Sequence, residues 1–233
     1  MYSEYFSKIY NELGWNYYPE AFAQTLLAWI AQQRLPVCDL LDIGCGTGVL
    51  CRLLRQSGIR ARGIDLSPAM IAIARAKDPK GWYDTADMTT YRLPSSFDLV
   101  TCTGDAINHL TRPSDVEQTF CNVRESLKSG GVFLFDLLGE GEISDEEPFE
   151  CALSDAVLTR LSMKKSEDGL VTLTIRAWEQ GKQTVNEQIT ERLYDTEEIR
   201  SMLTRAGFGS VQFSHHLLEN AQNVPTWYVT ART

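Results

Sequence analysis

The sequence predicts an α/β protein with a doubly wound, mostly parallel sheet of seven strands. Between residues 37 and 138, short apolar segments typical of buried strands alternate with segments of helical periodicity. A further helix and two further strands follow near the C-terminus. Strands and helices that alternate at these lengths form right-handed βαβ units, which place a parallel sheet between two layers of helices.

Two helices are expected ahead of the sheet, over residues 1–13 and 17–33, and Pro36 ends the second. The strands of the sheet are expected over residues 37–43, 60–65, 81–87, 97–103, 132–138, 210–218 and 226–233. The helices between them are expected over residues 48–58, 67–77, 113–131 and 195–208. Ser67 followed by Pro68 is a typical helix start, and the last two strands most simply form a hairpin.

The alternation of strands and helices stops after residue 138. Residues 139–150 are acidic and read as a loop. Residues 156–165, 170–178 and 183–193 then alternate with period two, separated by glycine-containing turns. We therefore expect one domain over residues 1–233, with a three-stranded antiparallel meander inserted over about residues 141–194.

Composition and charge limit the classes of partner. Of the 233 residues, 31 are acidic and 22 are basic, for a net charge of −9. This balance disfavours nucleic acid, whose phosphates require clustered lysine and arginine. No apolar run approaches the ~18 residues of a membrane helix, and the N-terminal residues have no apolar core, so we expect a cytoplasmic protein without membrane contact.

The six cysteines do not predict a metal site or a disulfide framework. No two of them form a C-x-x-C pair, and none lies at metal-ligand spacing from a histidine. Most lie within apolar segments and are expected to be reduced core residues, so no bound metal is expected.

The segment "LLDIGCGTGVL", residues 40–50, carries the functional signal. Its three glycines follow a predicted strand, and Asp42 precedes them. Acids also recur at or just after the ends of the other predicted strands, at Asp65, Asp87, Asp105 and Asp136. The carboxyl ends of parallel strands form the ligand edge of such a sheet. Carboxylates there would repel a pyrophosphate, and the glycine spacing is G-x-G-x-G, not the G-x-G-x-x-G of dinucleotide sites.

These residues favour a cationic ligand with a ribose and no phosphate, such as S-adenosylmethionine. The segment "LLDIGCGTG" resembles the first motif of the class I S-adenosylmethionine-dependent methyltransferases, which have a Rossmann-like fold. "GIDLS", "ADM" and "LKSGGVFLFDL" resemble the later motifs of that superfamily. The N-terminus and the late β insertion resemble a subgroup of small bacterial methyltransferases that includes methylators of sugars and small amines.

The resemblance, together with the chemistry of the cofactor, implies roles for individual residues. The glycines Gly44, Gly46 and Gly48 would let the backbone approach the methionine and ribose portions. Asp65 would accept hydrogen bonds from the ribose hydroxyls, and Asp87 from the adenine amine. The other implied contacts are Met88 through its backbone N–H, Leu66 and Met70 beside the adenine, Asp42 near the ammonium, and Thr103 under the sulfonium.

The acceptor side is less specific in the sequence. A bound sulfonium is already an activated donor, so the enzyme mainly aligns the acceptor and sometimes needs a base. His109 is the candidate catalytic base, and Asp105 and Asn108 would orient a polar acceptor. The aromatic N-terminus, residues 1–18, would fold over the cofactor as a lid, with Tyr10 near the methionine end.

The expected function is methyl transfer to nitrogen or oxygen of a small molecule. Three alternatives stay open: a nicotinamide-dependent oxidoreductase, a methyltransferase acting on protein or RNA, and a cofactor-binding module without catalysis. The β insertion would form a wall of the acceptor pocket or a homodimer interface. The acidic residues between 140 and 150 would steer an amine substrate, unless they form only a solvated loop.

Overall fold

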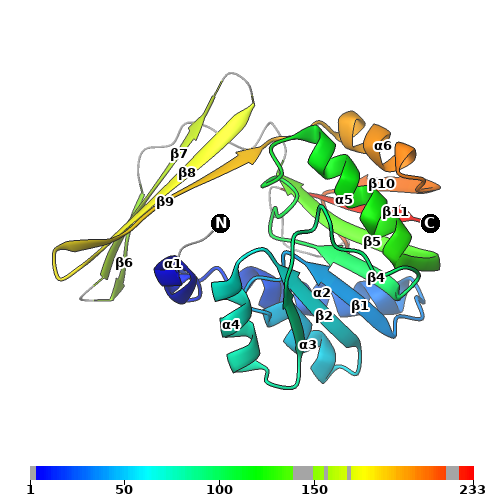
Figure 1. Ribbon diagram of the computed structural model, residues 1–233, viewed down its shortest axis with the longest axis horizontal. Helices are drawn as coiled ribbons and strands as arrows, with labels where there is room; N and C mark the ends of the chain where they lie inside the picture. The colour runs from blue at the N-terminus through cyan, green and yellow to red at the C-terminus, as the bar shows by residue number, and fades with distance from the viewer. Residues whose placement is uncertain (1–3, 139–148, 155–156, 167–168, 219–225) are drawn as a thin grey trace.

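A computed structural model of the protein describes residues 4–138, 149–154, 157–166, 169–218 and 226–233, which form two sheets and the helices that pack on them (Figure 1). The acidic segment over residues 140–147 lies outside the described residues. None of the helices in the described part of the chain is long and apolar enough to cross a lipid bilayer.

The larger sheet confirms the predicted seven strands. Its strand order is β10-β11-β5-β4-β1-β2-β3. Neighbours from β3 to β5 pair in parallel, whereas β11 pairs antiparallel with β5 and with β10 as the expected hairpin. The strands are β1 (Asp39–Ile43), β2 (Arg60–Asp65), β3 (Trp82–Thr85), β4 (Phe97–Cys102), β5 (Leu127–Leu138), β10 (Ser210–Ser214) and β11 (Thr226–Arg232).

Helices cover both faces of this sheet because buried strand residues point alternately to either side. Leu40 belongs to the core on one face, and the next residue, Leu41, to the core on the other. The first core includes residues from α2 (Tyr17–Gln32), α3 (Val49–Gln56) and α4 (Pro68–Lys77), and the second includes residues from α5 (Pro113–Ser126) and α6 (Thr196–Arg205).

Helix α4 starts at the predicted signal. The Ser67 hydroxyl accepts a hydrogen bond from the Met70 backbone N–H at 3.4 Å, and Pro68 occupies the first helical turn. Ser67 therefore ends the turn that follows β2, so the residues immediately before it are held at the edge of the sheet.

The strand order reverses at β1, whose neighbours are β2 and β4. The chain leaves β1 toward α3 and leaves β4 in the opposite direction across the sheet. At such a point the loops after the strands diverge and leave a crevice at their carboxyl ends. The glycine loop and the residues after β4 therefore lie where an α/β sheet binds its ligand.

The second sheet is antiparallel, as predicted, but has four strands in the order β6-β7-β8-β9. The expectation of three strands was wrong because β6 follows an acidic run and Pro148, which obscure its short alternating pattern. The strands are β6 (Phe149–Ser154), β7 (Val157–Lys165), β8 (Leu170–Glu179) and β9 (Lys182–Arg192).

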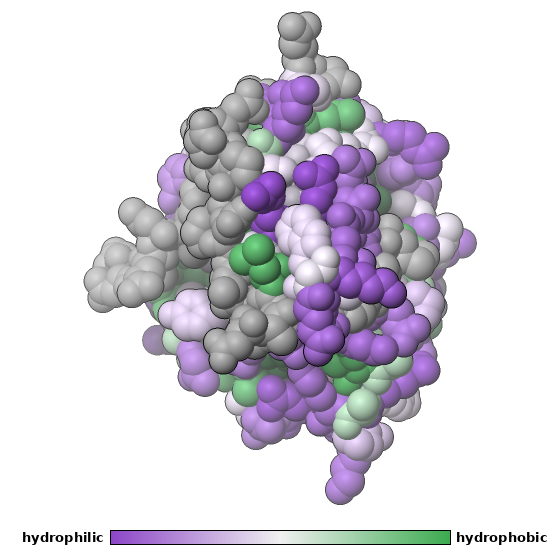
Figure 2. All heavy atoms as spheres, turned by 90° about the vertical axis from the view of Figure 1, so that its left-hand side faces the viewer, coloured by the Kyte–Doolittle hydropathy of each residue, from purple (hydrophilic) through white to green (hydrophobic). Residues whose placement is uncertain are grey.

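The short helix α1 (Glu4–Ile9) packs on this second sheet. Its Phe6 and Ile9 are buried in one cluster with Ile175 of β8 and Val185 and Ile189 of β9. Figure 1 shows α1 between the smaller sheet and α4 of the main domain. Figure 2 views the left-hand side of Figure 1, where hydrophilic side chains predominate and apolar ones form only isolated groups. The buried apolar side chains Ile175, Val185 and Ile189 therefore pack against the N-terminal segment.

Candidate active site

The three glycines of the loop after β1 have three different surroundings. A Cβ atom on Gly44 would lie 2.8 Å from the Ala106 side chain, and one on Gly48 would lie 2.7 Å from the Tyr83 ring. A Cβ atom on Gly46 would meet nothing within 4 Å. Gly44 and Gly48 are thus required by packing, whereas Gly46 faces open space at the edge of the sheet.

Asp65, the last residue of β2, holds this loop in place. Its Oδ2 accepts a hydrogen bond from the Gly46 N–H at 2.9 Å, and its Oδ1 accepts one from the Ser67 N–H at 2.8 Å. Burial raises the pKa of Asp65, and the two backbone hydrogen bonds oppose that rise. The carboxylate therefore lies beside the one glycine whose surface is open.

Asp42 is buried under the loop, with only 3% of its surface exposed. Its Oδ1 accepts from the Thr101 hydroxyl at 2.7 Å, and its Oδ2 contacts the Cys51 thiol at 3.9 Å. Burial raises its pKa to about 7 despite the Thr101 hydrogen bond. Because both oxygens face protein groups, its contact with a ligand stays a prediction, and its observed role is to join β1, β4 and α3.

The residues predicted beside the adenine fall into two groups. Leu66 is 49% exposed, whereas Met70 is fully buried and offers no surface to a ligand in this conformation. Asp87 is exposed, and its Oδ1 accepts from the backbone N–H and the hydroxyl of Thr89 at 2.8 and 2.7 Å. Met88 is half-buried and packs against the core of the sheet.

A buried side-chain amide holds the turn after β3 that contains Met88 and Thr89. Asn122 of α5 donates its side-chain N–H groups to the carbonyl oxygens of Met88 and Thr89, at 3.3 and 2.7 Å. Since Asn122 is only 3% exposed, these bonds fix the path of the chain after β3. No motif in the sequence indicated this role.

The loop after β4 is held by Asp136 of β5. Its two carboxylate oxygens accept hydrogen bonds from the backbone N–H groups of Gly104 and Asp105, at 2.9 and 2.8 Å. The Tyr18 hydroxyl of α2 also donates to this carboxylate. Gly104 and Asp105 both have positive φ, 73° and 52°, so Asp136 stabilises an unusual turn directly after Thr103. Thr103 itself is half-buried beside this turn.

The N-terminal segment reaches both loops. The Thr47 hydroxyl of the glycine loop donates to Asn11 Oδ1 at 3.1 Å. Burial raises the pKa of Tyr10, and the charges of Asp105 and Asp65 raise it further. Tyr10 also packs edge-on against Trp15, with ring centroids 5.2 Å apart. Tyr10 is therefore close enough to both Asp65 and Asp105 for their charges to raise its pKa.

Asn108 joins the loop after β4 to the inserted sheet. Its side-chain N–H groups donate to the carbonyl oxygens of Arg192 and Leu138, at 2.8 and 3.3 Å, and its backbone oxygen accepts from the Arg192 N–H at 2.8 Å. Asn108 is fully buried. The role predicted for it, orienting an acceptor, does not match these contacts, because its amide is occupied by backbone groups.

This connection places Glu191, at the end of β9, beside His109. One carboxylate oxygen each of Asp105 and Glu191 and one ring nitrogen of His109 all lie within 4.8 Å of one another. His109 Nε2 is 3.6 Å from Glu191 Oε1, and the Glu191 side chain is 12% exposed. We call these three side chains the carboxylate–histidine cluster. The sequence indicated two of its members, and it missed Glu191, which looked like any polar residue of an alternating strand.

Burial dominates the protonation of the cluster. It lowers the pKa of His109 to about 4 and raises that of Glu191 to about 7. Burial also raises the pKa of Asp105 well above its usual range, with further increases from the charges of Glu191 and Asp136. His109 is therefore neutral at neutral pH, and Glu191 is the group poised to exchange a proton there.

Comparisons with known proteins show similarity to methyltransferases. Residues 40–131 match the family model described as a methyltransferase domain. A protein from Geobacillus sp. (strain WCH70) that is assigned as a methyltransferase is 28% identical over 235 residues, covering 93% of this chain and 91% of the relative. Residues 40–131 therefore form a methyltransferase domain, and the chain is similar over most of its length to a protein assigned as a methyltransferase.

Solved structures of methyltransferases have the same fold as this chain. An S-adenosylmethionine-dependent methyltransferase from Clostridium acetobutylicum aligns with a TM-score of 0.78 and 23% identity, over 97% of both chains. An amino pentose methyltransferase from Micromonospora echinaspora, solved with S-adenosylmethionine, aligns with a TM-score of 0.78 and 21% identity, over 100% of this chain and 98% of the other. The shared fold covers the inserted sheet as well as the main domain.

The residues at the carboxyl ends of the strands fit S-adenosylmethionine. Gly46 leaves space for a ligand to approach the backbone, Asp65 supplies a carboxylate beside it, and Leu66 supplies an exposed apolar surface. When bound, S-adenosylmethionine supplies a methyl group that is activated by its sulfonium. The individual contacts predicted from the sequence stay predictions.

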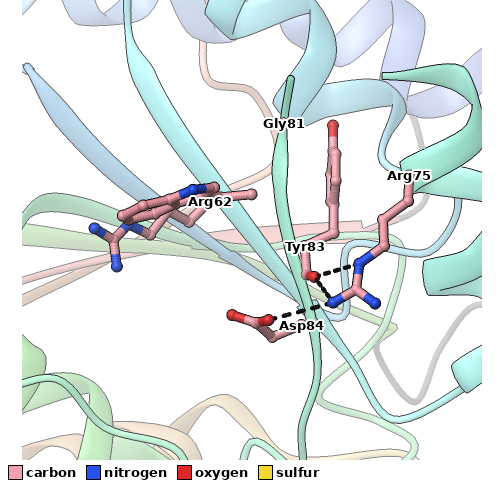
Figure 3. A pocket seen from close by; sticks show the side chains of 6 residues that line it. Arg62, Arg75, Gly81, Tyr83 and Asp84 are labelled. Atoms are coloured by element: carbon pink, nitrogen blue, oxygen red, sulfur yellow. Dashed lines mark hydrogen bonds and ion pairs between the residues drawn. The ribbon is translucent and has the colours of Figure 1, made fainter. Parts of the chain in front are cut away.

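A hollow at the outer edge strand β3 is separate from this site. Figure 3 shows Arg75 pointing to the Tyr83 carbonyl and Asp84, to which it donates at 3.0 and 3.4 Å. The Arg62 guanidinium lies 3.5 Å from the centre of the Trp82 ring. These side chains are occupied with one another, and none of them was predicted as a site residue.

Proposed function

We propose that this methyltransferase transfers the methyl group of S-adenosylmethionine to nitrogen or oxygen of a small molecule by in-line displacement. The observation that carries the proposal is the contact of the N-terminal segment with the glycine loop, where Thr47 donates to Asn11, next to Tyr10, whose pKa is raised by burial and by the charges of both Asp105 and Asp65. The cofactor-side residues and the carboxylate–histidine cluster thus both lie near this segment. A site covered in this way favours an acceptor small enough to fit beneath it.

In this proposal the sheet edge holds the cofactor. Gly46 allows close backbone approach, and Asp65 accepts hydrogen bonds from the ribose hydroxyls. Leu66 and Met88 contact the adenine, and Asp87 accepts from its amine. The carboxylates of this edge also attract a positively charged ligand, because no nearby cation among the described residues pairs with Asp42, Asp65 or Asp136.

The acceptor binds on the other side of Tyr10, between the loop after β4 and the inserted sheet. Two relatives support a small acceptor by their names: the amino pentose methyltransferase, and a dTDP-amino-sugar N,N-dimethyltransferase from Streptomyces fradiae that is 31% identical over 115 residues, covering 49% of this chain and 44% of the relative. The protein aligns the acceptor atom with the methyl group and excludes water with α1 and β9.

Calorimetric titration tests the cofactor half of the proposal. Wild-type protein is expected to bind S-adenosylmethionine and its demethylated product, S-adenosylhomocysteine, in the micromolar range and to bind NAD negligibly. Asp65→Ala should weaken binding by about 1–3 kcal/mol, because it removes a charged hydrogen-bond acceptor. The matched control is Asp84→Ala, which removes an exposed carboxylate of β3 and should leave affinity unchanged. Preferential binding of NAD would overturn the proposal.

A screen tests the acceptor half. Mixtures of small metabolites incubated with the protein and S-adenosylmethionine should yield a product that is one methyl group heavier. The same assay with folded protein and RNA substrates should yield none. Methylation of a macromolecule without any small-molecule product would contradict the proposed acceptor class.

A further inference from the structure

We infer that the acceptor is an amine and that the carboxylate–histidine cluster of Asp105, His109 and Glu191 binds its nitrogen, with Glu191 as the proton acceptor. The inference rests on the proposed function and assigns it one class of acceptor and one further catalytic residue. Glu191 belongs to the inserted sheet, so this sheet supplies chemistry to the site as well as a wall.

The spacing of the cluster suits an ammonium group. An ammonium nitrogen donates in tetrahedral directions to acceptors about 2.7–3.0 Å away, so the acceptors it shares lie up to about 4.9 Å apart. The nitrogen and oxygen atoms of the cluster lie within 4.8 Å of one another, and His109 Nε2 and Glu191 Oε1 are 3.6 Å apart. The three groups are therefore close enough to converge on one ammonium, and the contact between His109 and Glu191 widens to tetrahedral spacing when it binds.

The charges of the cluster also favour a cation. Asp105 and Glu191 bring two carboxyl groups together, and in the part of the chain described neither forms an ion pair with a lysine or arginine. The charges of Glu191 and Asp136 raise the pKa of Asp105, and the charges of Asp105 and Asp65 raise the pKa of Tyr10, so acidic groups predominate around the cluster. An amine that arrives protonated reduces the repulsion between the carboxylates, whereas an alcohol has no charge to offer.

Neutral His109 adds an uncharged hydrogen-bonding group to the two carboxyls. Because burial holds its pKa near 4, it stays unprotonated beside the arriving ammonium and does not repel it. The pKa of Glu191, about 7, is suited to taking a proton at neutral pH. His109 thus orients the nitrogen, and the sequence-based choice of His109 as the base is replaced by Glu191.

The step balances without any other reactant. The protonated amine gives one proton to the Glu191 carboxylate and becomes a neutral amine with a free lone pair. This nitrogen forms a bond to the methyl carbon while the carbon–sulfur bond breaks, and the bonding electrons stay on sulfur. The methylated amine leaves with a positive charge, and Glu191 returns its proton to solvent, so each turnover releases one proton.

Binding of methylammonium provides the direct test, with methanol as the uncharged probe of similar size. Each is titrated into the complex with S-adenosylhomocysteine while NMR follows the His109 ring resonances. We expect a saturable shift with methylammonium and none with methanol. Glu191→Gln should weaken methylammonium binding at least about tenfold. The absence of a saturable shift, or an equal shift in the variant, would overturn the inference.

Metal binding is the competing outcome. Zn²⁺ and Mn²⁺ are titrated into wild-type protein and Glu191→Gln, and methyl transfer is measured with and without EDTA. We expect activity to survive EDTA. Metal binding that requires Glu191, together with loss of activity in EDTA, would assign the cluster to a metal ion and overturn the amine assignment.

Turnover assays distinguish a failure of this inference from a failure of the proposed function. Small amines, including amino sugars, are assayed beside their hydroxyl analogues. The amine should react and its analogue should be at least about 100-fold slower. For the reactive amine, kcat/KM should rise with pH through about 7, and Glu191→Gln should lower it by about 10²–10⁴-fold and remove that inflection.

The control variant is Glu125→Gln, which removes an exposed carboxylate of α5 and should leave turnover unchanged. Affinity for S-adenosylhomocysteine should be the same in Glu191→Gln as in wild type. If the wild-type protein does not bind S-adenosylmethionine or S-adenosylhomocysteine, the proposed function itself is refuted. Methylation of hydroxyl analogues alone, with cofactor binding intact, would refute only the amine inference.

Discussion

At the scale of single residues, the glycine loop shows how one repeated residue type serves different needs. Gly48 is packed against Tyr83 and Ala74, whereas Gly46 faces open space. Both have positive φ, 74° and 53°. Replacement at either position therefore strains the backbone, but only at Gly48 does the new side chain also collide with the core.

We predict opposite profiles for Gly46→Ala and Gly48→Ala. Gly48→Ala should lower the free energy of unfolding by about 2–4 kcal/mol, because strain and collision add. Gly46→Ala should cost about 1–2 kcal/mol of stability but weaken S-adenosylhomocysteine binding more than tenfold. Chemical denaturation and calorimetry measure the two effects. If both variants lost affinity for S-adenosylhomocysteine in the same proportion to their loss of unfolding free energy, the distinction between the two glycines would be contradicted.

The sequence drew attention to the glycine loop, Asp65 and His109 because they follow predicted strands at the ligand edge, and their contacts with cofactor and acceptor stay predictions. It missed Glu191 and expected Asn108 to orient the acceptor, because the observed contacts of both residues join a loop of the main sheet to the end of the inserted one. It also could not separate Leu66, which is exposed, from Met70, which is buried, because both are apolar residues at the start of one helix.

At the scale of elements, two buried asparagines attach loops to their supports. Asn108 attaches the loop after β4 to β9, and Asn122 attaches the turn after β3 to α5. Each satisfies backbone carbonyls that would otherwise lose partners on burial. The two sides of the site are therefore positioned independently.

Alanine substitution of these asparagines should separate the two sides. Asn108→Ala and Asn122→Ala should each cost about 1–3 kcal/mol of stability, because each leaves buried carbonyls unpaired. Asn122→Ala should weaken S-adenosylhomocysteine binding, and Asn108→Ala should leave that affinity unchanged while lowering turnover. Calorimetry and a methyl-transfer assay distinguish them. The same functional defect in both variants would mean that the two loops move together.

The element boundaries were predictable where the sequence carries a physical signal. Ser67 and Pro68 start α4 as expected, and the alternating segments form antiparallel strands. The prediction missed β6 because this strand is short and follows an acidic segment, so its period-two alternation is not recognisable in the sequence. The contact of α1 with β8 and β9 was not predictable, since periodicity defines an apolar face but not its partner.

At the scale of the whole molecule, acidic residues at the two ends of the main sheet have opposite environments. At the amino end of β1, Asp39 bonds Arg60 and Lys128, and these hydrogen bonds lower its pKa to about 2. At the carboxyl end, Asp42 is buried without a cation and its pKa rises to about 7. One end is stabilised by ion pairs, whereas at the other end burial disfavours the charged form of Asp42.

This difference predicts how stability depends on pH. Because the pKa of Asp42 is raised in the folded state, its contribution is complete below about 4 and is lost as pH rises to about 7. Asp42→Asn should therefore reduce the decline in unfolding free energy over that interval, by up to about 1.4 kcal/mol per pH unit. Denaturation curves at several pH values, with exposed Asp84→Asn as control, measure it. Parallel curves for the variant and wild type would contradict the burial argument.

The packing of α1 on β8 and β9 has a consequence for biosynthesis. A ribosome makes Phe6 and Ile9 first, but Ile175, Val185 and Ile189 emerge more than 160 residues later. Until then the apolar face of the nascent N-terminus has no partner and is available to chaperones. The earliest segment of the polypeptide is thus among the last to reach its native contacts, and translation must pass β9 before the site can close.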